Sequence, residues 1–329
     1  MSFSIGTHRL DGRVLLAPMA GISDQPFREI CHRFGAALCG AEMLSAEQRL
    51  WTTSKSQRRM DHRGNSGLRA VQLAGSEPAQ LADAARVNVA LGAEVIDINM
   101  GCPAKKVCNR LCGSALLSDE ALVGRILDAV VRAVPVPVTV KIRTGPDPAY
   151  RNAVRIAMLA ENCGIAAIAI HGRTRAELFR GSAEYDTIRD VKSAVRIPVI
   201  ANGDITTPQQ AREVLDYTGA DAVMIGRGAQ GSPWIFRAVN AFLESEKIPP
   251  PLLQSFVTQI ILQHLESLYA FYGEYTGVRV ARKHLGWYCQ QQSLAPESRR
   301  ALMAADTSVS QFDTARRIFA GFTDAGAAA

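Results

Sequence analysis

The sequence predicts an α/β fold, a (β/α)8 TIM barrel, followed by a small all-helical domain. Eight short apolar runs, rich in β-branched residues, recur about every 30 residues, which is the length of one strand with its crossover helix. Alanine-rich segments with helical periodicity separate these runs, and the runs stop near a proline cluster at residues 249–251. Eight such units match the size of a barrel of roughly 250 residues.

The strand-like runs are residues 14–17, 38–41, 70–71, 95–98, 138–140, 168–170, 199–201 and 222–225. The clearest helical segments are residues 78–91, 120–134, 153–163 and 208–217. An open doubly wound sheet would show the same alternation. We favour the barrel because polar groups stand at the C-terminal ends of successive runs, and a barrel collects those ends around one mouth.

A domain boundary is expected where the repeat ends. The three prolines at residues 249–251 cannot continue a helix and are typical of a stiff linker. Beyond them, apolar residues between Leu253 and Phe271 follow helical spacing. We therefore predict a catalytic barrel in residues 1–245 and a helical domain in residues 246–329.

Composition limits the class of protein. With 329 residues, 47% of them hydrophobic, the chain can bury a large core. We find neither a signal peptide nor a membrane span, and the odd count of seven scattered cysteines indicates free thiols in a reducing compartment, hence a cytoplasmic protein. The net charge of +6 is compatible with a polyanionic partner but does not identify one.

Glycines and a cation follow the seventh and eighth runs. Barrels commonly bind a phosphate there, because glycine lets backbone N–H groups approach the oxygens and an arginine can pair with them. Two tight turns that need positive φ would select the same residues. The position in the fold favours the phosphate site, formed by Asn202, Gly203, Asp204, Gly226, Arg227 and Gly228.

Four neighbouring runs end in amide, ammonium and imidazole groups, namely Gln72, Asn99, Lys141 and His171. Such groups suit the edges of a flat heterocycle, and Lys141 would stabilise negative charge on a reduced ring. The residues alone leave two alternatives open: Lys141 as a Schiff-base lysine, and His171 as a structural histidine.

Cys102 follows the fourth run directly, so its thiol is expected at the mouth. A free thiol with a pKa of about 8.5 is mostly protonated at neutral pH and can donate a proton, although an inert buried cysteine is the alternative. Cys108 and Cys112 share this loop. Their spacing lacks the fourth ligand of a metal site, so no metal is expected.

Basic residues cluster near the expected mouth and on one helix of the second domain. Arg279, Arg282 and Lys283 share one helix face. Such clusters are most often solvated surface, but this arrangement also suits a folded RNA held through its phosphates. The clusters at the mouth are Lys55, Arg58, Arg59 and Arg63, then Lys105, Lys106 and Arg110, then Arg173, Arg175 and Arg180.

Six segments in order, at barrel spacing, resemble the tRNA-dihydrouridine synthases, most closely their bacterial B-type branch. The segments are APMAGISD (17–24), DINMGCPAKKV (97–107), HGRTR (171–175), IANGDI (200–205), MIGR (224–227) and ARKH (281–284). Each segment alone is a weak signal, but the ordered set is specific. The resemblance extends over about residues 12–288.

The resemblance implies an FMN-binding barrel and a helical tRNA-binding domain that together reduce the C5–C6 double bond of a D-loop uridine with NADPH. It implies hydride transfer from reduced FMN and a proton from Cys102, with the uridine flipped into the mouth. FMN would be bound by Pro18, Met19, Ala20, Gln72, Lys141, His171, Asn202, Gly203, Asp204, Gly226 and Arg227. Asn99 would contact the uracil, and the tRNA contacts would be Lys105, Lys106, Arg173, Arg279, Arg282 and Lys283. We expect a monomer.

Two other functions compete with this one. A non-catalytic RNA-binding or chaperone protein would keep the basic surface and would not take up FMN. An FMN barrel acting on a free pyrimidine would turn over without RNA.

Overall fold

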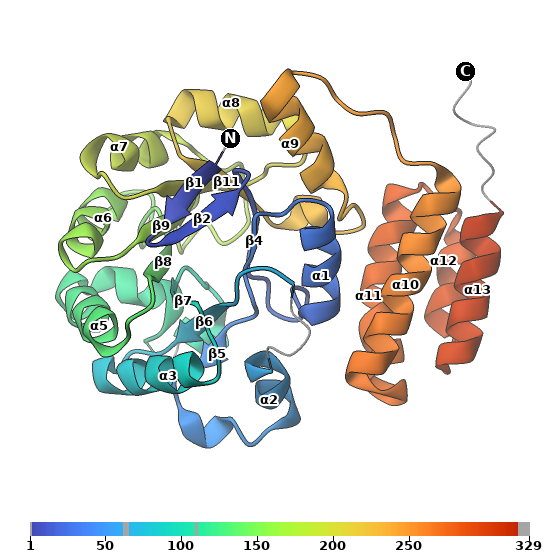
Figure 1. The fold of residues 1–329 in the computed structure, drawn as a ribbon, viewed down its shortest axis with the longest axis horizontal. Coiled ribbons are helices and arrows are strands. Elements are labelled where there is room, and N and C mark those ends of the chain that lie inside the picture. Colours follow the sequence, from blue (N-terminus) through green and yellow to red (C-terminus); the bar gives the residue numbers. More distant parts are fainter. Residues whose placement is uncertain (1, 62–65, 109–110, 322–329) are drawn as a thin grey trace.

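The computed structural model describes residues 2–61, 66–108 and 111–321. In this part of the chain, nine parallel strands curl into a barrel that helices surround (Figure 1). Hydrogen-bonded neighbours follow the order β4-β3-β11-β10-β9-β8-β7-β6-β5. The strands are β3 (Val14–Leu16), β4 (Leu38–Cys39), β5 (Leu44–Ser45), β6 (Ala70–Ala74), β7 (Val95–Met100), β8 (Val138–Arg143), β9 (Ala167–His171), β10 (Val199–Asn202) and β11 (Ala222–Ile225). The predicted barrel is confirmed.

The second predicted strand, residues 38–41, is divided in the structure. β4 pairs with β3 and β5 pairs with β6, and residues 40–43 join the two short strands. Gly40 lies at the break, where an added Cβ would be 2.7 Å from Cδ of Pro18. The backbone passes Pro18 too closely to accept a side chain. The barrel therefore closes here through continuous chain between β4 and β5.

Helices carry the chain back outside the barrel after successive strands. They are α1 (Gln25–Arg33), α2 (Ser54–Met60), α3 (Pro78–Ala90), α5 (Glu120–Ala133), α6 (Ala153–Asn162), α7 (Asp186–Ala194), α8 (Pro208–Thr218) and α9 (Ile235–Ser245), with the single turn α4 (Lys105–Cys108) in one loop. Capping residues stabilise the first turns of these helices. Asp119, before α5, accepts the Leu122 N–H at 2.9 Å, and Thr207 caps α8, whose first residue is Pro208. The four predicted helices are confirmed to within one residue at each end.

A hairpin that the sequence analysis did not predict covers the N-terminal end of the barrel. β1 (Ser2–Ile5) pairs antiparallel with β2 (His8–Asp11), and Gly6 supplies the positive φ of +56° in the turn. Ile5 and Leu10 are buried against barrel residues such as Leu15. In Figure 1 the hairpin lies across the ring of strands. The predicted mouth is at the opposite end.

An all-helical region follows the barrel, as predicted, and lies beside α1 (Figure 1). It consists of α10 (Gln254–Tyr272), α11 (Glu274–Gln291), α12 (Pro296–Ala304) and α13 (Ser308–Ala320). These helices enclose a hydrophobic core of their own, in which Leu265, Leu285 and Phe319 are fully buried. Among the described residues, no helix is both long and apolar enough to cross a membrane.

Candidate active site

A cavity of about 910 Å³ opens where the strands end. Its volume is near the upper end of the roughly 300–1,000 Å³ typical of small-molecule sites. The structure brings together around it every residue predicted to contact the cofactor, and also Asn99 and Cys102. These lining residues are Pro18, Met19, Ala20, Gln72, Asn99, Cys102, Lys141, His171, Asn202, Gly203, Asp204, Gly226 and Arg227.

Asn202 organises one wall of the cavity from the end of β10. Its side-chain Nδ2 donates to the carbonyl of Met224 at 2.7 Å, which fixes the orientation of the amide. The Oδ1 atom therefore faces Lys141 and accepts from Nζ at 2.9 Å. It also lies 3.1 Å from Nδ1 of His171, which must be the protonated ring nitrogen because an amide oxygen only accepts.

Cations dominate the electrostatics of this wall. Burial, followed by the charge of Arg143, lowers the pKa of Lys141 to about 8. Burial, followed by the charges of Lys141, Arg143 and Arg173, lowers the pKa of His171 to about 2. His171 is therefore a neutral imidazole at neutral pH. The wall presents ammonium and guanidinium groups that can stabilise negative charge on a bound ring.

A chain of hydrogen bonds leads from the half-buried Asp97 to the backbone of Cys102. Asp97 accepts from Nε2 of Gln72 at 2.7 Å, and Oε1 of Gln72 accepts from Nδ2 of Asn99 at 2.8 Å. Oδ1 of Asn99 then accepts the N–H of Cys102 at 3.0 Å. Because a carboxylate only accepts, Asp97 determines the orientation of both amides. The sequence analysis missed Asp97, although it stands two residues before Asn99 in β7.

The Cys102 loop is held from both sides. The carbonyl of Cys102 accepts from the hydroxyl of Ser114 at 3.0 Å, and Gly113 has a φ of +62° with no room for a side chain beside that carbonyl. The nearby thiol of Cys108 contacts the same carbonyl at 3.5 Å. Burial raises the pKa of the Cys102 thiol above its usual value. The thiol is therefore protonated at neutral pH, as a proton donor requires.

Asp204 and two arginines form the corner predicted to hold a phosphate. Asp204 accepts from Arg173 at 2.5 Å and from Arg227 at 2.8 Å. Gly203 has a φ of +143°, and a Cβ there would lie 2.6 Å from Cβ of Ala183, so only glycine fits. A Cβ on Gly226 would make ordinary contact, at 3.7 Å, with Ala17 and Met19. Backbone and cation are thus available to an anion at this corner.

Comparison with known proteins identifies the family. The family model "Dihydrouridine synthase (Dus)" matches residues 15–322. The chain belongs to the dihydrouridine synthase family. It is 53% identical to tRNA-dihydrouridine synthase B of Vibrio vulnificus over 96% of this chain and 98% of that protein, and 55% identical to the one of Xanthomonas axonopodis pv. citri over 96% and 95%. A solved histamine dehydrogenase from Rhizobium sp. 4-9 shares the fold, with a TM-score of 0.57 and 12% identity over 80% of this chain and 50% of that one.

The residues around the cavity fit the FMN expected of this family. A flavin needs a flat slot with polar edges and an anchor for its phosphate. The described residues supply both, because Lys141 and Gln72 stand on the polar wall and Gly203, Gly226 and Arg227 lie at the phosphate corner. Pro18 and Met19 add an apolar surface.

One predicted contact is wrong in this structure. Arg173 was expected to touch the nucleic acid, but only 1% of it is exposed. Its guanidinium donates to Asp204 and to the carbonyls of Arg180 and Gly181. Arg173 is part of the wall behind the phosphate corner. Its motif position gave no signal of burial, because the partner Asp204 is supplied by another strand.

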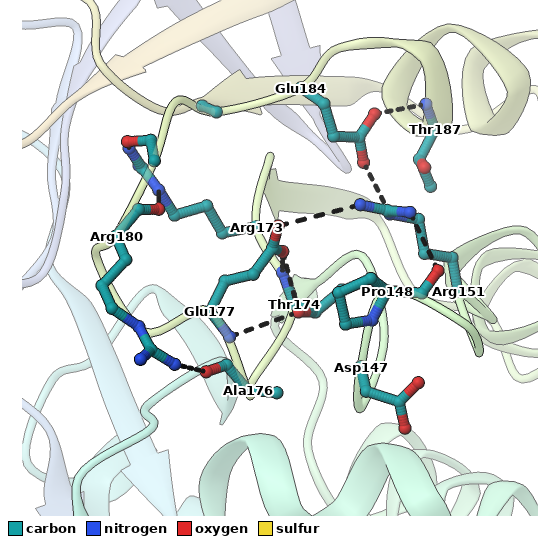
Figure 2. Close-up of polar contacts among 12 residues, drawn as sticks. Asp147, Pro148, Arg151, Arg173, Thr174, Ala176, Glu177, Arg180, Glu184 and Thr187 are labelled. Carbon is teal, nitrogen blue, oxygen red and sulfur yellow. Dashed lines mark hydrogen bonds and ion pairs between the residues drawn. The ribbon is translucent and has the colours of Figure 1, made fainter.

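The loop between β9 and α7 places Leu178 and Phe179 at the mouth, and the sequence analysis singled out neither of them. Phe179 lines the cavity and is 54% exposed. The centre of its ring lies 5.3 Å from the guanidinium carbon of Arg143 and 5.3 Å from that of Arg227. Arg143 in turn donates to the carbonyl of Leu178 at 2.7 Å. Figure 2 shows the polar contacts that stiffen this loop, including Thr174 with Glu177 and Arg151 with Glu184.

The basic residues of α11 differ in how they are engaged. Arg279 is exposed, with its guanidinium carbon 3.5 Å from the ring centre of Tyr275. Arg282 pairs with Asp306 at 2.9 Å. Lys283 donates to the carbonyl of Gly21, in the loop after β3, and so lies near the barrel mouth. The side chains of Lys105 and Lys106 fall outside the part of the chain that the structure describes.

Proposed function

We propose that this chain reduces the C5–C6 double bond of a D-loop uridine in tRNA, with FMN in the barrel cavity and NADPH as the reductant. One observation carries the proposal: a protonated thiol, a cationic wall and a glycine-lined phosphate corner meet around a single cavity of about 910 Å³. This set of groups suits addition of a hydride and a proton to a conjugated base.

Binding of FMN is assigned to two parts of the cavity. Of the residues that line the cavity, Lys141 and Gln72 would bond the ring edge. The rest of the cofactor, including its phosphate, would be held by His171, Asn202, Gly203, Asp204, Gly226 and Arg227. When bound and reduced by NADPH, FMN supplies the hydride that adds to C6 of the uracil. Lys141 is suited to the ring edge because its charge opposes the negative charge of a reduced flavin.

Cys102 supplies the proton. Addition of hydride at C6 leaves negative charge on C5 and the adjacent carbonyl oxygen, and the Sγ–H bond of Cys102 breaks as the C5–H bond forms. The thiolate is then reprotonated from solvent. Asn99 is proposed to contact the uracil through the hydrogen of Nδ2 that does not bond Gln72, while its Oδ1 holds the Cys102 loop.

The tRNA is assigned to the mouth and the adjacent face of α11. Residues 1–245 would form the catalytic domain, and residues 246–329 the tRNA-binding domain. Arg279, Arg282 and Lys283 are proposed to contact phosphates, together with Lys105 and Lys106. We further propose that the chain acts as a cytoplasmic monomer. The free cysteines of the described residues support a reducing compartment.

Cys102→Ala tests the proposed chemistry. The variant should retain FMN and its reduction by NADPH, but lose about 10² to 10⁴ in the rate of uridine reduction in tRNA. Cys163→Ala, which removes a half-buried thiol that does not line the cavity, is the control and should stay near the wild-type rate. Wild-type turnover by Cys102→Ala would remove Cys102 as the acid.

Two assays separate the competing functions. A non-catalytic RNA-binding protein would be colourless after incubation with FMN and desalting. An enzyme for free pyrimidines would reduce uracil or its relatives without tRNA. Dihydrouridine mapped in total tRNA from cells lacking this gene, with and without the wild-type gene restored, would identify both the substrate and its position.

A further inference from the structure

A buried cluster lies between the barrel and the helical region, away from the cavity. It consists of Asp24, which caps α1, His264 of α10 and His284 of α11. At most 3% of any of the three is exposed. One ligand atom from each side chain lies within 4.8 Å of one from each of the others.

The two histidines leave a lone pair or proton unused in this cluster. Within the described residues, Nε2 of His264 and Nε2 of His284 are buried and have no hydrogen-bond partner. Buried polar atoms in folded proteins nearly always have a partner, which is protein, water or an ion. Two such atoms from adjacent rings, whose centres are 4.5 Å apart, indicate that a third species belongs between them.

Hydrogen bonds already orient the carboxylate of Asp24 and the ring of His264. The carboxylate of Asp24 accepts from the Phe27 N–H at 3.0 Å and from the Tyr272 hydroxyl at 3.0 Å. Nδ1 of His264 lies 3.0 Å from the hydroxyl of Tyr288. Outer hydrogen bonds of this kind hold the ligands of metal sites, where the second ring nitrogen of histidine is bonded to a neighbour and the first binds the metal.

We propose that Asp24, His264 and His284 bind one divalent cation of the zinc type at the junction of the two regions. Two imidazole nitrogens and one carboxylate oxygen are a donor set that zinc favours. In a tetrahedral site, zinc bonds of about 2.0–2.2 Å place ligand atoms roughly 3.3–3.6 Å apart. Binding would therefore draw together any pair of ligand atoms that now lies as far apart as 4.8 Å. A water completes the fourth position.

The surroundings favour this cation. The ring of Phe27 lies 5.8 Å from that of His264 and 5.3 Å from that of His284, and Trp287 packs edge-on against His284 at 5.3 Å. These rings exclude solvent from the cluster.

The location gives the cation a structural role. Asp24 comes from the barrel and both histidines from the helical region, so a bound ion would join the two. Asp24 follows Gly21 in the same loop, and Gly21 is bonded by Lys283, the neighbour of His284. The ion would thus fix the basic face of α11 relative to the loop after β3.

The test uses the FMN-loaded protein incubated with Zn²⁺ and then desalted. We expect about one retained zinc per chain by mass spectrometry and a higher melting temperature than in the metal-free protein. Asp24→Asn and His284→Gln should each lose the retained zinc and the rise in melting temperature. Asparagine is as good a helix cap as aspartate, so Asp24→Asn is expected to fold.

His32→Gln, on α1 but outside the cluster, is the matched control and should retain zinc. Cobalt substitution gives a second readout, since tetrahedral Co²⁺ absorbs beyond the flavin bands. Bound FMN and circular dichroism report whether each variant is folded. No retained zinc in the wild-type protein, or equal retention in Asp24→Asn and His284→Gln, would overturn the proposal.

Discussion

Oδ1 of Asn99 accepts the backbone N–H of Cys102 at 3.0 Å, so the loop that carries the thiol is fixed by the residue at the end of β7. Asn99 can do this only in one amide orientation. Gln72 imposes that orientation, and Asp97 imposes the orientation of Gln72. The position of the proposed acid therefore depends on the carboxylate of Asp97, from which three successive hydrogen bonds lead to Cys102.

Asp97→Asn should disrupt that relay. An asparagine can donate as well as accept, so Gln72 and Asn99 would no longer be limited to one orientation. We expect uridine reduction to fall by about 10²-fold, as a misplacement of about 1 Å can cause, while NADPH still reduces the flavin. Stopped-flow measurement of the two half-reactions separates these effects.

Thr139→Val is the control for Asp97→Asn. Thr139 donates to the other carboxylate oxygen of Asp97 at 2.7 Å, and its loss leaves the bond to Gln72 in place. We expect a smaller decrease in uridine reduction. If both variants slow flavin reduction as much as uridine reduction, the relay acts on the flavin and not on Cys102.

Lys141→Met should stabilise the FMN-free protein at neutral pH. Because the folded pKa is about 8 and the ordinary value 10.5, the folded chain binds fewer protons than the unfolded chain between these values. The free energy of unfolding contributed by Lys141 thus rises with pH in this window, and below about pH 8 the fold bears the cost of a buried ammonium.

The expected gain from Lys141→Met is a few degrees in melting temperature at pH 7, shrinking as the pH rises from 8 towards 10. In the variant, Oδ1 of Asn202 still accepts a hydrogen bond from Nδ1 of His171. FMN affinity should fall, since the charge facing the ring edge is lost. Thermal melts across pH and FMN titration measure both; a gain that grows with pH contradicts the assignment.

Asp204→Asn should destabilise the phosphate corner. Arg173 is buried, and it loses its counter-ion in this variant. Breaking a buried ion pair lowers the free energy of unfolding by roughly 3–5 kcal/mol. We expect a loss of about 3 kcal/mol for Asp204→Asn, because the side chain of Asp204 is about one-third exposed. Urea unfolding measures the loss. Asp83→Asn, which removes an exposed pair with Arg86, should cost less than about 1 kcal/mol.

The barrel could be predicted because its signals are local and repeated. The helices α5 and α8 each carry their own N-cap, Asp119 and Thr207, and the predicted strands are short apolar runs. The division of the second strand at Gly40 could not be predicted, because its cause is the distant Pro18. The N-terminal hairpin was missed because only Ile5 and Leu10 are buried in it.

The site was predicted as far as strand ends allow. Residues at or near the C-terminal end of a barrel strand line the mouth, so Lys141, His171 and Asn202 could be assigned from position. The hydrogen-bond partners that other strands and loops supply to a residue could not be predicted in this way. Asp97 was missed and Arg173 was placed on the surface because their roles depend on contacts with Gln72 and Asp204.

Asp306→Asn should strengthen the binding of tRNA. Arg282 on the basic face of α11 is paired with Asp306, whose side chain is 89% exposed, so the carboxylate both occupies the guanidinium and repels phosphates. Removing that charge breaks the ion pair of Arg282, whose Nη2 still donates to the carbonyl of Ala305 at 2.9 Å. Affinity should therefore rise several-fold, and the decrease of log K with log salt should become steeper. Binding measured across salt concentrations tests this.

Two further variants decide whether Arg282 is the group released. Arg282→Ala should weaken binding and make the salt dependence shallower, and adding Asp306→Asn to it should then change little beyond long-range charge. Asp313→Asn, which frees Arg316 on α13, is the matched control for loss of one exposed carboxylate. Equal gains from Asp306→Asn and Asp313→Asn would mean that net charge, and not Arg282, attracts the RNA, and the binding face would then have to be sought away from α11.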